Sequence, residues 1–156
     1  MRKAFTMVEL VFVLVIIGVL VTIAVPKFNA TRADAEVTKA KTTVANIRTA
    51  ISSEVQRKIL KADYTPITSL GGDSHSYDMP LFDFFNGLKA NGRVLEYPPR
   101  SCRSGATGCW MKTGSNRYRY YFPKGSGISS VDFTVTNNRF ECDTAHNPTG
   151  CRKLER

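Results

Sequence analysis

Apolar and polar residues are segregated along this chain. Residues 5–25 form an almost unbroken apolar run, in which Glu9 is the one charged residue. As a helix, these 21 residues extend about 30 Å, which is the thickness of the apolar part of a bilayer. The run therefore predicts a membrane-spanning helix, whereas the remainder has the mixed pattern of a soluble domain.

A different periodicity follows this run. Between Ala33 and Ala62, apolar residues recur at steps of three and four with charged residues between them, which predicts an amphipathic helix with one face in a core. The apolar positions are Val37, Ala40, Val44, Ile47, Ile51, Val55 and Ile59. Packing of this face on a β-sheet fits better than a coiled coil, because regular charge pairs beside the apolar positions are missing.

Pro26 lies between the two helical patterns. Proline removes one backbone hydrogen bond, so we expect a kink or a break between Thr22 and Lys27, and a simple helix end is the alternative. If the helix only bends there, its 58 residues from Phe5 to Ala62 reach about 85 Å. Such a helix overshoots any domain of this size, so its first half must be buried in lipid or in copies of itself.

The middle of the chain, residues 63–92, is rich in turn residues. One short helix is predicted there, at residues 81–88. Its aromatic residues, Phe82, Phe84 and Phe85, are expected in the core rather than in a patch for a partner.

Beyond Arg93 the pattern changes to short β-branched and aromatic runs, which predict strands. These runs are 94–97, 117–122, 131–136 and 139–142. Asn137 and Asn138 predict a hairpin turn between the last two, because Asn tolerates positive φ. The predicted fold class is α+β, a long N-terminal helix packed on a small antiparallel sheet around one core. The expected segments are a leader at 1–4, the apolar helix half at 5–25, the amphipathic half at 26–62 and a globular head at 63–156.

Basic residues outnumber acidic ones by 22 to 13, so the formal net charge is +9, and it is +7 without Arg2 and Lys3. The excess is strongest between Arg93 and Arg119. It permits anionic partners without naming one, and a solvated basic surface is the simpler interpretation. The alternative is a DNA-binding surface, in which cations grip phosphates and aromatic rings stack on bases. Its residues are Arg100, Arg103, Trp110, Arg117, Tyr118, Arg119 and Tyr120.

All four cysteines lie in the C-terminal third, and an even number behind an export signal favours disulfides. Three pairings are possible. We favour Cys102 with Cys109 and Cys142 with Cys151, since each pair closes a short loop rich in turn residues. A zinc site made by all four thiolates is the alternative, although zinc sites usually have closer cysteine pairs.

Glu9 is the most informative residue in the chain. An unpaired charge in the apolar part of a membrane costs at least about 2.5 kcal/mol, and its default explanation is a functional role with a partner. Cleavage between Ala4 and Phe5 creates an α-amino group four residues before Glu9, and this cation supplies the partner. Because Arg2 and Lys3 precede the run, the rest of the chain is expected outside the cytoplasm.

Several features of this segment occur together. They are a short basic leader, Phe5 as the first residue after the cut, Glu9 as the fifth, and an apolar run that contains Gly18 and ends before Pro26. In this combination the segment resembles the N-terminal segments of type IV pilins and of the pseudopilins of type II secretion systems. That family usually has Gly before the cut, whereas this chain has Ala4, so we expect cleavage that is slower but not lost.

The resemblance implies a prepilin peptidase that cuts after Ala4 and N-methylates Phe5, with Glu9 setting the register against a neighbour's N-terminus. It implies a subunit that is held in the inner membrane by one helix, with its head in the periplasm, and that assembles with other pilins or pseudopilins into a filament. The loop between Cys142 and Cys151 is similar to the disulfide-closed C-terminal regions of many pilins.

The sequence carries no signature of catalysis or of a cofactor. It has no Gly-rich phosphate loop, no H-E-x-x-H and no G-x-S-x-G motif, and His75 and His146 stand alone in turn-rich segments. Major pseudopilins bind calcium as a family, but Asp73 and Asp78 lack the spacing of a calcium loop, so no metal is predicted. The competing hypotheses are an exported enzyme whose signal is cleaved after Ala24 and a plain anchored protein. Both leave the carboxylate in the apolar run unexplained.

Overall fold

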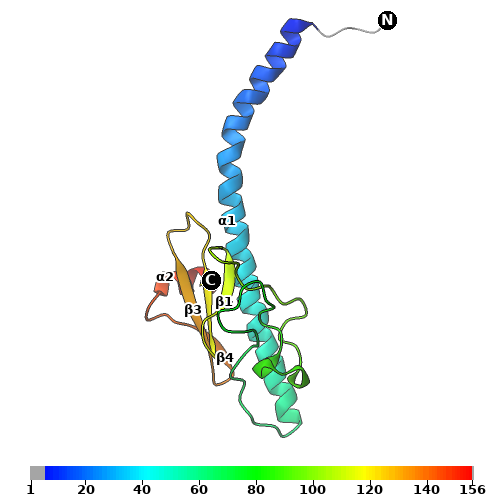
Figure 1. Cartoon of the computed structure of the whole chain (residues 1–156), viewed down its shortest axis with the longest axis vertical. Helices are drawn as coiled ribbons and strands as arrows, with labels where there is room; N and C mark the ends of the chain where they lie inside the picture. The colour runs from blue at the N-terminus through cyan, green and yellow to red at the C-terminus, as the bar shows by residue number, and fades with distance from the viewer. Residues whose placement is uncertain (1–5, 156) are drawn as a thin grey trace, which may run out of the picture.

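The computed structural model describes the backbone of residues 6–155, and the side chains of residues 6–22 and 32–155. Its fold is α+β, with one long helix and a four-stranded antiparallel sheet. In chain order the elements are α1 (Met7–Leu60), the 3₁₀ turns η1 (Phe85–Gly87) and η2 (Lys89–Asn91), β1 (Cys109–Lys112), β2 (Arg117–Tyr121), β3 (Ser130–Thr136), β4 (Arg139–Cys142) and α2 (Pro148–Glu155). We call the chain from residue 63 onward the head. Figure 1 shows that the head packs beside the C-terminal half of α1, whereas the N-terminal half of α1 extends away from it.

The C-terminal half of α1 carries the predicted apolar stripe. The stripe is buried from Val37 to Ile51, Val55 is partly buried, and Ile59 is 54% exposed because the head does not cover the last turn. The helix ends at Leu60, two residues before the predicted end. The reason is that Ala62 takes a left-handed φ of 55°, which a right-handed helix does not allow.

The sheet has the order β1-β2-β3-β4, and each neighbouring pair is antiparallel. Successive side chains of a strand point to opposite faces. In β2 this alternation buries Tyr118 and Tyr120 in the core shared with α1 and leaves Arg117, Arg119 and Tyr121 on the other face, which we call the outer face. The core contains further aromatic rings in mutual contact, among them Phe82, Trp110, Phe133 and Phe140.

The hairpin between β3 and β4 turns at Asn137 and Asn138, which confirms the prediction. Both residues have positive φ, 50° and 62°, as two-residue hairpin turns require. The side chain of Asn138 also accepts a hydrogen bond of 2.7 Å from the backbone N–H of Ile67. The turn therefore closes the hairpin and also anchors the segment that follows α1.

Residues 94–97 do not form the predicted strand. The N–H of Val94 donates to the carbonyl of Asp83 at 2.9 Å, but no regular ladder follows. The facing segment interrupts the pairing, because Phe82 takes a left-handed φ of 60° between the isolated bridges Phe84–Arg93 and Pro80–Arg100.

The predicted helix at residues 81–88 is also wrong. Only the 3₁₀ turn η1 forms there, since Phe82 and Asn86 take left-handed φ values of 60° and 53°. The prediction that the aromatic residues enter the core is confirmed for Phe82 and Phe85, whereas Phe84 is half-buried.

Two elements lie outside the sequence prediction. β1 is a four-residue strand at the edge of the sheet, too short to give a clear alternation. α2 begins at Pro148, directly after Asn147, whose side chain accepts a hydrogen bond of 2.8 Å from the N–H of Gly150. Asn followed by Pro is a typical helix start, so the sequence did contain the signal for α2.

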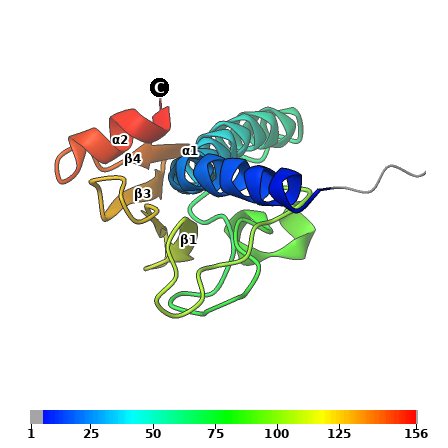
Figure 2. The same cartoon turned by 90° about the horizontal axis from the view of Figure 1, so that it is seen from above.

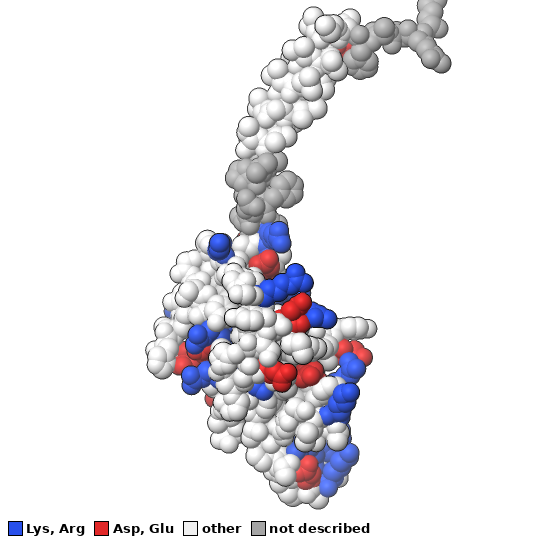
Figure 3. Space-filling view, in the orientation of Figure 1, with Lys and Arg blue, Asp and Glu red and all other residues white. Residues whose placement is uncertain are grey.

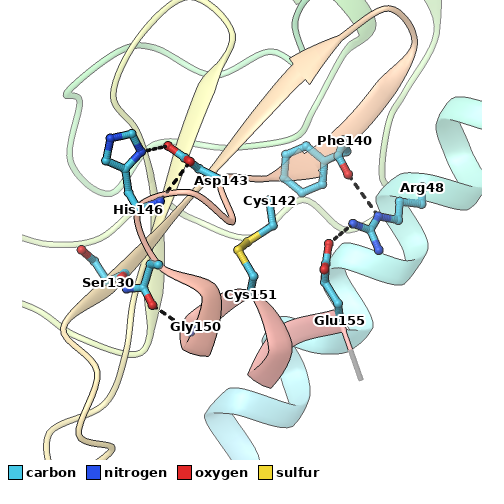
Figure 4. The surroundings of a disulfide bond; sticks show 10 residues. Arg48, Ser130, Phe140, Cys142, Asp143, His146, Gly150, Cys151 and Glu155 are labelled. Atoms are coloured by element: carbon cyan, nitrogen blue, oxygen red, sulfur yellow. Dashed lines mark hydrogen bonds and ion pairs between the residues drawn. A yellow bond between two sulfur atoms is a disulfide. The ribbon is translucent and has the colours of Figure 1, made fainter.

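Both predicted disulfides are present, Cys102–Cys109 and Cys142–Cys151. The first closes the loop that leads into β1, and the second joins β4 to α2 (Figure 4). The alternative of a zinc site made by all four thiolates is therefore wrong, because each sulfur is already bonded to its partner.

α2 lies alongside α1, as Figure 2 shows from above. Its buried residues Cys151 and Leu154 belong to the same core as the stripe of α1. Arg48 connects α1 to both β4 and α2, because it donates to the carbonyl of Phe140 in β4 at 3.1 Å and pairs with Glu155 of α2 (Figure 4). The C-terminal half of α1 is thus covered by the sheet and by α2.

Candidate functional site

The N-terminal half of α1 exposes an apolar surface that no other described part of the chain covers. Every large apolar side chain from Met7 to Val21 is between 42% and 82% exposed. These side chains surround the helix, because apolar residues fill every position in this stretch except Glu9 and Gly18. Figure 3 shows its visible face without charge apart from an acidic patch at the N-terminal end. We call residues 7–22 the protruding helix.

Glu9 lies in the first turn of α1, where the helix dipole favours a negative charge. Its backbone N–H donates to Oγ1 of Thr6, the N-cap residue, at 3.3 Å. The T-x-x-E spacing of Thr6 and Glu9 is that of a capping box, so the sequence held a signal for Thr6 that was missed. None of the ion pairs among the described residues includes Glu9.

Ala4 and Phe5, the predicted cleavage site, lie outside the described residues, and their role stays a prediction. Within the parts of the chain whose side chains are described, no helical stretch is both long enough and apolar enough to cross a membrane. The predicted span of residues 5–25 includes Phe5 and residues 23–25, which fall outside that description. α1 continues through Pro26 as one helix, so the alternatives of a break or a helix end at this residue are wrong. The side chains of residues 23–31 are not described, and the kink stays a prediction.

A hollow of about 580 Å³ lies on the outer face of the sheet, between the first two strands and two loops of the head. The loops are fixed to β1 by backbone hydrogen bonds, from His75 N–H to Lys112 O at 2.8 Å and from Cys102 N–H to Trp110 O at 2.9 Å. Its basic and aromatic lining residues are His75, Tyr77, Arg103, Arg117, Arg119 and Tyr121. We call this hollow the cationic groove.

The described lining of the cationic groove contains no acidic side chain. Arg119 is held by Asp132 of β3 through hydrogen bonds of 2.7 and 2.8 Å, and this carboxylate raises the pKa of Arg119. Arg103 lies 3.5 Å from Asp78 at the rim and stays mostly exposed. Arg117 is exposed and takes part in none of the ion pairs among the described residues. Two nearby carboxylates therefore face three guanidinium groups, which leaves the groove positive.

The aromatic residues predicted to stack on bases are buried. Trp110, Tyr118 and Tyr120 are 4%, 0% and 1% exposed and belong to the core. The Tyr118 hydroxyl accepts a hydrogen bond of 2.9 Å from Leu70 N–H, and the Tyr120 hydroxyl donates to the carbonyl of Glu36 at 3.1 Å. This part of the DNA-binding prediction is wrong, because neighbouring residues of a strand face opposite sides of the sheet.

Arg100 is the one predicted arginine outside the cationic groove. It pairs with Asp78 at 3.6 Å and donates to the carbonyl of the same residue at 2.7 Å. Its side chain lines a smaller hollow beside α1. Sequence reasoning missed Tyr77 and Tyr121, although the alternation of β2 is a signal that places Tyr121 on the same face as the two arginines of that strand.

The described residues contain no group of three His, Cys, Asp or Glu side chains placed to hold a metal ion. His75 lines the cationic groove, whereas His146 lies near α2 and pairs with Asp143 at 2.8 Å (Figure 4). The hydrogen bond with His146 lowers the pKa of Asp143. Asp78 is engaged by two arginines and Asp73 is exposed, so neither belongs to a ligand cluster.

Comparison with protein-family models, with curated proteins and with solved structures found no match. Two features of the molecule itself therefore bear on its function. One is the protruding helix with Glu9, and the other is the cationic groove of the head.

Proposed function

We propose that this chain is a structural subunit of a type IV pilus or of a type II secretion pseudopilus. In this proposal a prepilin peptidase cuts between Ala4 and Phe5 and methylates the new N-terminus. The chain is then held in the inner membrane, with its head in the periplasm, until its N-terminal helix packs into a filament. The observation that carries the proposal is the protruding helix, whose apolar side chains have no partner in the described chain.

Exposed apolar surface of this extent is a site for protein or lipid. Burying one Val, Leu or Ile side chain is worth about 1.5–3 kcal/mol. Packing many of them against neighbouring copies therefore outweighs the loss of translational and rotational freedom, which costs about 4–15 kcal/mol. Insertion into lipid as a plain membrane anchor would bury the same apolar surface, so the apolar side chains alone do not distinguish an anchor from a filament subunit.

Glu9 is the residue that favours filament assembly over plain anchoring. A carboxylate in an apolar bundle needs a cation, and cleavage before Phe5 creates one at the start of each subunit. A plain anchor has no use for this carboxylate. The competing explanation is local, because the capping box with Thr6 also uses a Glu at this position.

The N-terminal peptide of the protein purified from its native membrane tests the proposal first. A mass that corresponds to methylated Phe5 supports the filament-subunit class. A chain that begins at Val25 identifies an exported protein, and an intact Met1 identifies a plain anchored one. Either of these outcomes contradicts the proposal.

A pair of variants separates the two roles of Glu9. Glu9→Gln keeps the capping box but removes the charge, so we expect normal processing and a large loss of sheared filaments. Thr6→Ala removes the cap, which is worth about 1 kcal/mol, and keeps the charge, so filaments should persist. Wild-type filament yield from Glu9→Gln together with loss in Thr6→Ala assigns Glu9 a capping role and removes the main support for the proposal.

A further inference from the structure

We propose that the cationic groove binds single-stranded nucleic acid, with its arginines on the phosphates and its tyrosines on the bases. This goes beyond filament assembly, because it assigns a ligand to the outer face of the sheet, which is turned away from α1. The groove and the protruding helix share no residue. One subunit can therefore use both surfaces at the same time.

Three guanidinium groups converge on the groove. Arg117 and Arg119 lie on the same face of β2, two residues apart, which separates them by about 6.7 Å along the strand. Arg103 comes from the loop that the Cys102–Cys109 disulfide closes. A row of cations suits a polymer with a regular row of anions better than it suits a single carboxylate.

Arg119 is already ordered before a ligand arrives. The Nε and one terminal nitrogen of Arg119 donate hydrogen bonds to Asp132, so the guanidinium has one orientation in the groove. An ordered guanidinium loses little conformational freedom when it binds a phosphate. The loop that carries Arg103 is likewise tied down by its disulfide and by the hydrogen bond from Cys102 to Trp110.

Two tyrosines, Tyr77 and Tyr121, lie in the same lining. Tyr77 is 57% exposed, and Tyr121 is half-buried. Unpaired bases stack on such rings whatever their sequence, whereas bases inside a duplex are already stacked on one another. The combination of cations with an exposed and a half-buried tyrosine therefore favours a single strand over a duplex, and nucleic acid over an acidic peptide or a sulfated polysaccharide.

The test is fluorescence anisotropy of labelled oligothymidylate added to the full chain in detergent micelles, at increasing salt. For single strands, the logarithm of the affinity falls with the logarithm of salt by about 0.7 per phosphate contact. The double variant R103Q/R117Q should bind about tenfold more weakly at low salt, with a salt slope lower by about 1.4. Thermal unfolding of each variant checks that the head is intact.

The matched control is R139Q/R152Q, which changes the net charge by the same amount. Arg139 and Arg152 are both exposed, and neither lines the groove. We expect this pair to bind within about twofold of the wild type, because phosphate contacts act over short distances in salt. Equal weakening of both pairs means that binding reports total charge, and it overturns the proposal.

A second pair of variants tests stacking. Tyr77→Ala should weaken oligothymidylate binding by about fivefold or more, the lower end of what one base–aromatic stack contributes. Tyr97, which is 90% exposed and outside the groove, serves as the control through Tyr97→Ala. Equal affinity of the two variants overturns the assignment of Tyr77.

Two further outcomes overturn the proposal as a whole. One is the absence of binding at low salt. The other is binding to heparin that depends on Arg103 and Arg117 while oligothymidylate binding does not, because the groove then recognises a different polymer. All of these measurements use unassembled protein, so a failure of filament assembly leaves them unaffected.

Discussion

Residues 7–22 and residues 37–51 belong to the same helix and are both rich in Val and Ile, yet their side chains lie in opposite surroundings. Ile17 is 51% exposed in the first stretch, whereas Ile47 is fully buried in the second. The sheet and α2 cover the second stretch, and no described part of the chain covers the first. The chain therefore buries one stretch of α1 by itself and leaves the side chains of the other exposed.

The difference follows from how the apolar residues are distributed around the helix. In residues 37–51 the charged residues Lys39, Lys41 and Arg48 separate the apolar positions and leave one face for a core. In residues 7–22 apolar residues surround the helix, so a sheet on one side cannot bury them all. The stability of the head should therefore be separable from the assembly that we propose for the protruding helix.

The largest expected effect comes from truncating the same residue type in each half. Ile47→Ala removes a buried side chain from the core and should lower the free energy of unfolding of the head by about 2–5 kcal/mol. Ile17→Ala removes an exposed side chain and should change it by less than about 0.5 kcal/mol. Thermal unfolding of both variants in detergent measures the difference. Similar shifts in the two variants would break the comparison.

A smaller effect is expected from the Cys142–Cys151 disulfide, which closes a loop of about nine residues and joins α2 to β4. Replacing both cysteines by Ala should lower the free energy of unfolding by about 2.5 kcal/mol. Hydrogen exchange should show that α2 loses protection while the protruding helix is unchanged, since α2 covers only the C-terminal half. The control is the double Ala variant of Cys102 and Cys109, in which α2 should keep its protection. Full protection of α2 without its disulfide would contradict this account.

The parts of the fold that the sequence predicts correctly are those with a long or chemically specific signal. The stripe of α1 repeats over several turns, and the Asn137-Asn138 turn has the residues that positive φ favours. β1 has four residues and is beyond the reach of periodicity. The strand expected at 94–97 fails because Phe82, in the segment that faces it, takes a left-handed φ, and the pattern of residues 94–97 does not reveal this.

The candidate sites also contain features that the sequence predicts and features that it does not. Glu9 stands out from sequence alone, because a carboxylate in an apolar run conflicts with its surroundings whatever the fold. The basic part of the cationic groove was also predictable from the excess of arginine. Its aromatic part was not, because Tyr118 and Tyr121 differ only in which face of β2 they occupy, and that depends on the register of the strand.

The smallest expected effect concerns the end of α1, where the helix passes into the head. Asp63 accepts hydrogen bonds from the backbone N–H and the hydroxyl of Thr65 and lies 3.2 Å from Lys58. The hydrogen bonds from Thr65, together with Lys58, lower the pKa of Asp63 from 3.8 to about 2. Between these two values the unfolded chain binds more protons than the folded one, so the folded head loses stability as the pH falls.

Replacement of Asp63 by Asn removes this titration. The unfolding midpoint of the wild type should fall more steeply than that of Asp63→Asn between pH 4 and pH 2, about the window that the lowered pKa defines. Asp34→Asn is the matched control, because Asp34 is an exposed carboxylate of α1 that makes no side-chain hydrogen bond or ion pair among the described residues. We expect this control to follow the wild type. Because Asp63 and Lys58 lie where α1 joins the head and not in the protruding helix, the effect belongs to the head alone, and filament yield at neutral pH should be the same in all three proteins. A loss of filaments in Asp63→Asn would mean that the two halves of α1 are coupled, and it would contradict the independence of the head from the protruding helix.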